Sequence, residues 1–262
     1  MNELTVDAKQ EDIIISFQKA VHLKAKRKIG DYFELKFGVK LYQIGKGKPP
    51  QNKSHSEGKV FEANSKVDED YFKLLRARNI QRYTIREEQH FIKYGVHLAE
   101  PRNINLFKGD RILLQRIVSK SCLDATFTDR TLICNTDVIT LKPKSSFNCK
   151  FYLGILGSSL LGSFIKSRNI NLDRNVFPKI NTKTLEDVPV PDVAKVDKKI
   201  VEEITKLVDH LLKLNEEKQQ LTLHSKIDQI QNRIDYAEQR INEIVYELYG
   251  LTKEEIALIE NA

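Results

Sequence analysis

Two stretches in the last third of the chain carry apolar residues at alternating spacings of three and four. This pattern puts the apolar side chains on one seam of a helix and predicts coiled-coil packing. Each seam covers about 22 residues, so each helix should be about 33 Å long. The seam positions are Ile200, Ile204, Leu207, Leu211, Leu214 and Leu221 in the first stretch, and Ile227, Ile230, Ile234, Ala237, Ile241, Ile244 and Leu248 in the second.

The segment LTLHS (221–225) separates the two seams and predicts a turn that folds them into an antiparallel hairpin. The alternative is one continuous helix that dimerises, so self-association through the coiled coil stays open. A third, short helix is expected over KEEIALIE (253–260). It follows the helix-ending Gly250, with Thr252 as its N-cap and Glu255 at the capping-box position.

The first part of the chain has a different pattern, in which short runs of β-branched and aromatic residues alternate with turn residues. One longer apolar segment, YLGILGSSLLGSFIKSR (152–168), predicts a buried helix. The prolines of DVPVPD (187–192) then interrupt regular structure. We therefore expect an α+β fold, with a mixed-sheet domain over residues 1–191 and a coiled-coil helical hairpin over residues 192–262. The expected strands are 90–94, 111–118, 125–129, 131–135 and 136–142.

Charge divides the chain at the same place. Residues 192–262 hold 10 basic and 15 acidic residues, a balance of −5, whereas residues 1–191 hold 33 basic and 21 acidic residues, a balance of +12. A positive field of this size favours a polyanionic partner such as nucleic acid. The acidic helical region is not expected to lie along phosphates.

Cysteine content and hydropathy indicate a cytoplasmic protein. Cys122, Cys134 and Cys149 are odd in number and have no CxxC spacing, which argues against a disulfide framework. No N-terminal segment resembles a signal peptide. The longest apolar run, 151–165, is shorter than the roughly 20 residues that a membrane span needs, so no membrane partner is expected.

The sequence offers no convincing catalytic or metal-binding constellation. The six histidines lack the spacing of zinc ligands, and no phosphate-binding GxxxxGK[ST] motif is present. In PDVAKVDKK, Asp192, Asp197 and Lys199 loosely match a metal-dependent nuclease pattern. They lie at a proline-led helix start, where Asp197 is better explained as a charge that complements the helix dipole. We expect no catalytic residue, no metal and no cofactor.

The order of several segments resembles the TaqI-like C-terminal specificity domain, the target recognition domain of fused restriction-modification enzymes and related adenine-specific DNA methyltransferases. It is also similar to half of a Type I restriction specificity subunit. The resemblance covers roughly residues 28–260. The segments that carry it are KIGDYFELKFGVKLYQIGKGKPPQ, KLLRARNIQRY, PRNINLFKGDRILLQRI, DATFTDRTLICNTDVITLKP, YLGILGSSLLGSFI, FPKINTKTLEDVPVP and ELYGLTKEEIALIE.

The fused enzymes of that family carry a methyltransferase domain with a cofactor glycine motif and an Asn-Pro-Pro-aromatic tetrad, and this sequence has neither. The resemblance therefore implies a non-catalytic specificity module, either a separate polypeptide or a fragment of a longer enzyme. Its implied partners are double-stranded DNA and a methyltransferase, with or without an endonuclease, as a domain or subunit.

The stretch YFKLLRARNIQRY (71–83) corresponds in that family to a segment near the DNA-facing side. As a helix it would spread its arginines around the surface, and as an irregular loop it could point them all outward. Arginine suits base reading because its fork can bind guanine O6 and N7 together, whereas lysines suit phosphate contacts. The candidate DNA-binding residues are Lys46, Lys48, Lys53, Arg76, Arg78, Arg82, Arg102, Arg116, Lys120 and Lys179.

The expected function is sequence-specific recognition of double-stranded DNA within a restriction-modification system, which directs a methyltransferase or endonuclease to its target. The coiled-coil hairpin would act as a spacer and a docking surface. The alternative is a protein-interaction scaffold, in which the heptads pair with a partner and the basic domain binds an acidic protein.

Overall fold

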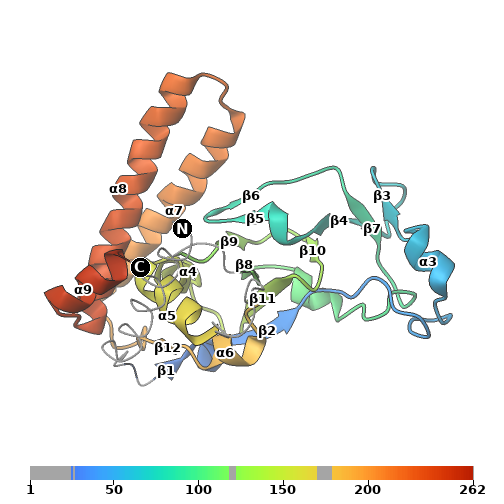
Figure 1. Cartoon of the computed structure of the whole chain (residues 1–262), viewed down its shortest axis with the longest axis horizontal. Helices are drawn as coiled ribbons and strands as arrows, with labels where there is room; N and C mark the ends of the chain where they lie inside the picture. Colours follow the sequence, from blue (N-terminus) through green and yellow to red (C-terminus); the bar gives the residue numbers. More distant parts are fainter. Residues whose placement is uncertain (1–24, 26, 118–121, 170–178, 262) are drawn as a thin grey trace, which may run out of the picture.

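The computed structural model describes residues 25, 27–117, 122–169 and 179–261. Figure 1 shows two sheets in the centre and on one side of the molecule, and a long helical hairpin that projects from the other side. The short helix α3 (Lys53–Glu57) and the hairpin lie toward opposite ends of the longest axis. The expected α+β class is confirmed.

The first sheet has four antiparallel strands in the order β2-β11-β8-β9. Its two central strands are almost fully buried, whereas β2 alternates between buried and exposed positions. One face of β2 is therefore in solvent, whereas β9, the other edge strand, has three of its four residues buried. The strands are β2 (Phe33–Phe37), β8 (Arg111–Gln115), β9 (Ala125–Thr128) and β11 (Val138–Pro143).

The second sheet has the order β10-β4-β7-β3 and is mixed, since β10 pairs with β4 in parallel and the other pairs are antiparallel. It encloses a smaller hydrophobic core of its own, which includes Leu74, Ile92 and Ile133. The strands are β3 (Glu62–Ala63), β4 (Tyr71–Leu75), β7 (Phe91–Lys93) and β10 (Ile133–Cys134).

Residues 71–83 form neither of the two conformations considered for them. They begin as strand β4, continue through the 3₁₀ turn η1 (Ala77–Asn79) and enter β5 (Ile80–Gln81), which pairs with β6 (Thr84–Ile85). The pairing of β4 with β7 and β10 imposes the extended form. The remaining short elements are β1 (Arg27–Lys28), α2 (Ile29–Tyr32), η2 (Ile104–Phe107), α6 (Thr182–Glu186) and β12 (Pro189–Val190), and β1 pairs with β12.

The apolar segment 152–168 forms two helices, α4 (Lys150–Leu156) and α5 (Ser159–Asn169), instead of one. The break falls at Gly157, where an added Cβ would lie 2.3 Å from the Tyr83 hydroxyl oxygen. Gly154 brings α4 close to the hairpin, because a Cβ there would lie 2.5 Å from Cγ2 of Ile204. Small residues in this segment thus allow the close packing of two neighbours.

The two heptad stretches form α7 (Lys198–Gln220) and α8 (His224–Tyr249), joined by three residues. Their contacts run in opposite directions, since Arg240 pairs with Glu203 at 2.8 Å and Lys218 hydrogen-bonds Gln231. The antiparallel hairpin is confirmed, and the continuous helix is wrong.

The third helix, α9 (Lys253–Glu260), is also as expected. Gly250 ends α8 with φ +63°, and Thr252 and Glu255 form the predicted capping box. Within the described residues, no helix is long and apolar enough to cross a membrane.

The larger hydrophobic core continues across residue 191. It contains β-sheet residues such as Ile112 and Ile139, residues of α4 and α5, and the inner seam of the hairpin, including Ile204 and Ile241. The hairpin is therefore packed onto the sheet domain at its base. The far end of α7 also contacts this domain, since the Gln219 side chain donates to the Thr84 hydroxyl on β6. The boundary at residue 191 stays a prediction.

Candidate nucleic-acid interface

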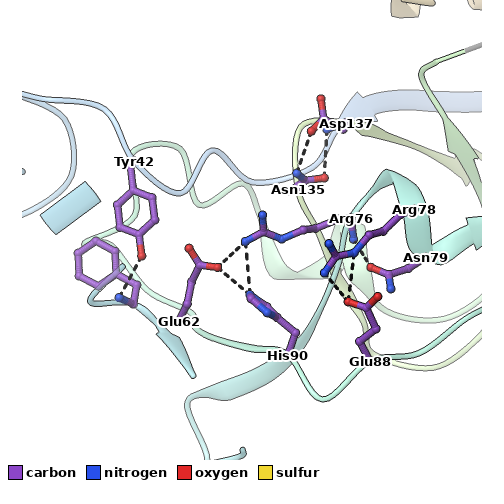
Figure 2. A network of polar contacts seen from close by, with 10 residues as sticks. Tyr42, Glu62, Arg76, Arg78, Asn79, Glu88, His90, Asn135 and Asp137 are labelled. Atoms are coloured by element: carbon purple, nitrogen blue, oxygen red, sulfur yellow. Dashed lines mark hydrogen bonds and ion pairs between the residues drawn. The ribbon is translucent and has the colours of Figure 1, made fainter. Parts of the chain in front are cut away.

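Arg76, directly after β4, is held by a nearly buried carboxylate. Glu62 on β3 forms an ion pair with the Arg76 guanidinium and accepts a hydrogen bond from His90 Nε2 at 2.7 Å. The Glu62 side chain is only 7% exposed, whereas that of Arg76 is 36% exposed. Figure 2 shows Glu62 between Tyr42 on one side and Arg76 and His90 on the other. A partly exposed guanidinium fixed in this way is oriented before any ligand arrives.

Arg78 lies two residues further, on the turn η1, and is far more exposed. Its Nε and Nη2 donate to Glu88 Oε2 at 3.2 and 2.6 Å, while Asn79 closes the turn by accepting from the Arg76 backbone amide at 2.7 Å (Figure 2). The hydrogen bond from Arg78 lowers the pKa of the Glu88 carboxyl. Because exposed ion pairs contribute little stability, a phosphate or base can replace Glu88 at small cost.

The parallel pairing of β4 and β10 brings two chain segments to one end of the sheet. Leu75 pairs with Cys134, and the Leu75 carbonyl accepts from the amide of Asn135 at 2.9 Å. The residues that follow each strand, Arg76 and the turn Asn135–Asp137, therefore lie next to each other, as Figure 2 shows. The Asn135 side chain stabilises this turn by donating to Asp137 at 3.1 Å.

Arg116 reaches the same turn from the end of β8. Its Nη1 donates to the Thr136 carbonyl at 3.1 Å and its Nε to the Ile180 carbonyl at 3.2 Å. The guanidinium also lies over the ring of Phe37, with 4.1 Å to the centroid. Arg116 thus connects the turn to the segment that precedes α6, and part of its donor capacity is used inside the protein.

Lys179 and Arg102 complete the surroundings of the turn. Lys179 Nζ lies 3.6 Å from the Asp137 carboxylate. Arg102 Nε donates to the Gly38 carbonyl at 3.3 Å, and Gly38 packs so closely that an added Cβ would lie 2.3 Å from the Asn135 carbonyl oxygen. We call Arg76, Arg102, Arg116 and Lys179 the basic cluster. Its members are far apart in sequence. Arg116 and Lys179 contact the turn directly, whereas Arg76 and Arg102 lie near it through Leu75 and Gly38, which contact Asn135.

Three other candidates lie on a separate loop. Lys46 and Lys48 are exposed on the segment between β2 and α3, and Lys53 is the first residue of α3, with an exposed ion pair to Glu57 at 3.2 Å. This loop belongs to the end of the molecule farthest from the hairpin (Figure 1). It is therefore a second cationic surface, distinct from the basic cluster.

Arg82 faces the hairpin, with its side chain 20% exposed. Its guanidinium donates to Glu238 on α8 and to the Gly157 carbonyl, both at 2.6 Å. A DNA contact by Arg82 stays a prediction, and the contacts observed here are structural. Arg111, the first residue of β8, is fully buried and donates to three backbone carbonyls. Burial lowers the pKa of Arg111. Lys120 lies outside the described residues.

The residues of the nuclease-like pattern have structural partners. Asp197 is the N-cap of α7 and accepts from the Lys199 amide at 2.8 Å, as expected. Asp192 accepts from the Tyr32 hydroxyl at 3.0 Å and from the Ala194 amide at 3.3 Å. Across the described ranges, no group of three or more histidine, cysteine, aspartate or glutamate side chains could hold a metal ion.

Sequence reasoning missed the groups that orient the arginines. Glu62 and His90 lie 14 residues to either side of Arg76 and reach it only because β3 and β4 both pair with β7. The sequence weakly indicated the turn Asn135–Asp137, since Asn and Asp two residues apart favour a tight turn. Nothing in the sequence indicated that Arg116 and Lys179 would contact it.

The fold and these residues can now be compared with known proteins. Residues 72–190 match the family model of the TaqI-like C-terminal specificity domain. This segment contains the second sheet except β3, the turn Asn135–Asp137 and all four residues of the basic cluster. Residues 72–190 are a TaqI-like C-terminal specificity domain. The resemblance seen in the sequence is confirmed.

Relatives of this specificity domain occur in restriction-modification proteins. A protein of Methanocaldococcus jannaschii named as a type II restriction enzyme and methyltransferase is 23% identical over 205 residues. Among solved structures, the Type IIL restriction-modification enzyme MmeI in complex with DNA gives a TM-score of 0.52 at 13% identity over 92% of this chain. The HsdS subunit from Thermoanaerobacter tengcongensis gives 0.41 at 14% identity over 97% of this chain.

The chain corresponds to a part of these proteins. It covers 17% of the Methanocaldococcus jannaschii protein, 36% of the MmeI chain and 51% of the HsdS chain. The likeness to MmeI shows a shared fold that extends beyond the specificity domain into the hairpin, because it includes 92% of this chain.

Proposed function

We propose that this chain recognises a specific sequence of double-stranded DNA and directs a methyltransferase, with or without an endonuclease, to that site. The observation that carries the proposal is the basic cluster, in which four cations from distant parts of the sequence lie at or near one turn at the end of β4 and β10. Supporting it are the specificity-domain family and the fold shared with MmeI, whose structure is a complex with DNA.

In this proposal Arg76 and Arg78 read bases. Glu62 fixes one side of the Arg76 guanidinium and leaves it partly exposed, so little side-chain entropy is lost when it binds. A guanidinium can donate two parallel hydrogen bonds to guanine O6 and N7, which discriminates by roughly 1–3 kcal/mol. Arg78 is available once Glu88 is displaced.

Lysines and the remaining arginines hold the phosphate backbone. Lys179, Lys46, Lys48 and Lys53 are exposed, and compact ammonium groups suit phosphate contacts that set the register on DNA. Arg116 donates to carbonyl groups with Nε and Nη1 and keeps Nη2 for a phosphate. Arg102 donates to the Gly38 carbonyl and pairs with Glu100 at 2.8 Å, so a phosphate would bind its remaining donors or displace Glu100. These contacts would supply affinity without sequence preference.

The hairpin supplies a spacer and a docking surface in this proposal, and the chain performs no reaction itself. Residues 192–262 carry a net charge of −5, which disfavours contact with phosphates and favours a protein partner. The partner would be a methyltransferase domain or subunit, or a second recognition domain. The sequence contains no Asn-Pro-Pro-aromatic tetrad of its own.

Selection from a random pool of duplexes tests the proposal. The purified chain should enrich one short sequence and bind it more tightly than scrambled competitors of the same length. Arg76→Ala should abolish the enrichment. Arg233→Ala, which removes an exposed arginine from the hairpin, should leave it intact. A chain that binds no duplex at low salt, yet forms a stable complex with a protein partner, would show that it is an interaction scaffold instead.

A further inference from the structure

The loop of residues 43–51 is a built structure, which a buried glutamine holds in place. Gln51 is 4% exposed, and its side-chain oxygen accepts from the Gln43 amide at 2.9 Å. Its side-chain nitrogen donates to the Leu41 carbonyl at 2.9 Å and to the His97 carbonyl at 2.7 Å. Because both N–H donors and the oxygen of this amide are hydrogen-bonded, the loop has one well-defined conformation.

Backbone contacts close the same loop. The Gly45 amide donates to the Gln51 carbonyl at 2.8 Å, and the Gln51 amide donates to the Lys46 carbonyl at 2.7 Å. Gly47 has φ +84°, and an added Cβ would lie 2.3 Å from the His97 carbonyl oxygen, so only glycine fits there. The Lys48 amide donates to the Val96 carbonyl at 2.9 Å, which places Val96 beside the loop.

Ile44 on this loop and Val96 beside it are large apolar side chains with high solvent exposure. Ile44 is 68% exposed and Val96 is 67% exposed, and they are two of only six large hydrophobic residues with high exposure in the described part of the chain. The exposed Ile44 side chain buries little apolar surface, so it contributes little to the stability of the free protein. Exposed apolar groups on an otherwise polar loop indicate a contact surface.

The surroundings of the two apolar residues are cationic and unpaired. Between Glu34 and Glu57 the sequence has five lysines and no acidic residue. Lys46 and Lys48, close in sequence to Ile44, have no ion pair or side-chain hydrogen bond within the described residues. By contrast, Arg76, Arg102 and Lys179 of the basic cluster each form an ion pair. Two unpaired ammonium groups on the same loop as an exposed apolar side chain suit a surface that contacts both the phosphates and a base edge of DNA.

We propose that residues 43–51 and Val96 form a second DNA-reading element, in which Ile44 or Val96 contacts the C5-methyl group of a thymine while Lys46 and Lys48 bind the flanking phosphates. This inference rests on the proposed DNA recognition and adds a base preference that arginine alone does not provide. The thymine methyl is the apolar feature of the major groove, and an aliphatic side chain reads it by contact.

Uracil substitution gives a direct test. In the selected duplex, each thymine is replaced in turn by uracil, which removes the methyl group and keeps the base pair. Wild-type protein should bind one of these duplexes more weakly, by about fourfold, since a buried methyl contributes about one CH₂ equivalent. Ile44→Ala and Val96→Ala should weaken binding to the thymine duplex, and one of them should make thymine and uracil equivalent at that position.

Val67→Ala is the matched control, since Val67 is a similarly exposed valine outside this loop. It should keep the full thymine preference. Thermal unfolding of Ile44→Ala should match that of the wild type, because an exposed side chain contributes little to the core.

Two results would overturn the inference. One is that wild type, Ile44→Ala and Val96→Ala all lose the same factor, or nothing, at every thymine. The other is that Ile44→Ala binds DNA normally and loses a protein partner. Failure of the proposed function looks different, since the wild-type chain would then select no duplex at all.

Discussion

Arg82 and Glu238 form an ion pair across the junction between the specificity domain and the hairpin. The distance from Arg82 Nη1 to Glu238 Oε2 is 2.6 Å, and the two side chains are 20% and 19% exposed. A second contact lies nearby, where Asn242 on α8 accepts from the Ser159 amide at 2.9 Å and donates to its hydroxyl at 3.1 Å. These polar contacts fix the direction in which the hairpin leaves the domain.

Removal of Arg82 should destabilise the protein. Arg82→Ala leaves the Glu238 carboxylate buried without its partner, and breaking one half of a buried pair costs about 3 kcal/mol. Urea unfolding measures this loss. Arg78→Ala is the matched control, because the Arg78–Glu88 pair is exposed and its loss should change the urea midpoint very little. Equal losses in the two variants would contradict the structural role of Arg82.

Arg76 should control the choice of base at one position of the target. Arg76→Ala should reduce discrimination there by about 1–3 kcal/mol, measured by competition with duplexes that differ at single base pairs. Glu62→Gln keeps the arginine and weakens its ion pair, so it should relax the same position by a smaller amount. A uniform loss of affinity for all sequences would instead make Arg76 a phosphate contact.

Binding should depend strongly on salt. If about six phosphates are neutralised, the logarithm of affinity should fall against the logarithm of salt concentration with a slope near −5. The double variant Lys46→Ala/Lys48→Ala should make this slope shallower by about 2, because each lost phosphate contact contributes about 0.9. Lys206→Ala, at an exposed position on α7, should leave the slope unchanged. A slope near zero in a filter-binding titration would contradict the proposed binding to DNA phosphates.

Asp192 should make stability sensitive to acid. The hydrogen bond from the Tyr32 hydroxyl lowers the pKa of its carboxyl below the ordinary value of 3.8. A carboxyl with a lowered folded-state pKa stabilises the protein above its unfolded pKa, and this contribution is lost as pH falls through the folded pKa. Asp192→Asn should therefore be less stable than wild type near neutral pH, and the difference should shrink below about pH 4. Urea unfolding at several pH values measures it.

The same variant separates structure from catalysis at this position. Neither the wild type nor Asp192→Asn should cleave DNA when magnesium is added, because the Asp192 carboxylate already accepts hydrogen bonds from the Tyr32 hydroxyl and the Ala194 amide. Magnesium-dependent cleavage that Asp192→Ala abolishes would restore the nuclease alternative.

The sequence predicted the larger elements well where one local pattern dominates. The heptads of α7 and α8, the cap at Thr252, the strands β8, β9 and β11 of the first sheet and the strands β7 and β10 of the second depend on short-range spacing. Residues 71–83 were misread, because their extended form depends on hydrogen bonds to β7 and β10. The break at Gly157 was also missed, since it depends on the distant side chain of Tyr83.

The candidate site was predictable in its residue types and not in its arrangement. By itself the sequence determined a cationic first region and an acidic region with two heptad seams, because charge balance and heptad period are properties of the chain. Only the tertiary structure decided that Arg82 binds the hairpin, that Arg111 is buried, and that Arg76, Arg102, Arg116 and Lys179 lie at or near one turn. The availability of each guanidinium depends on which carboxylates and carbonyls the fold brings within hydrogen-bond distance, and those partners come from distant segments.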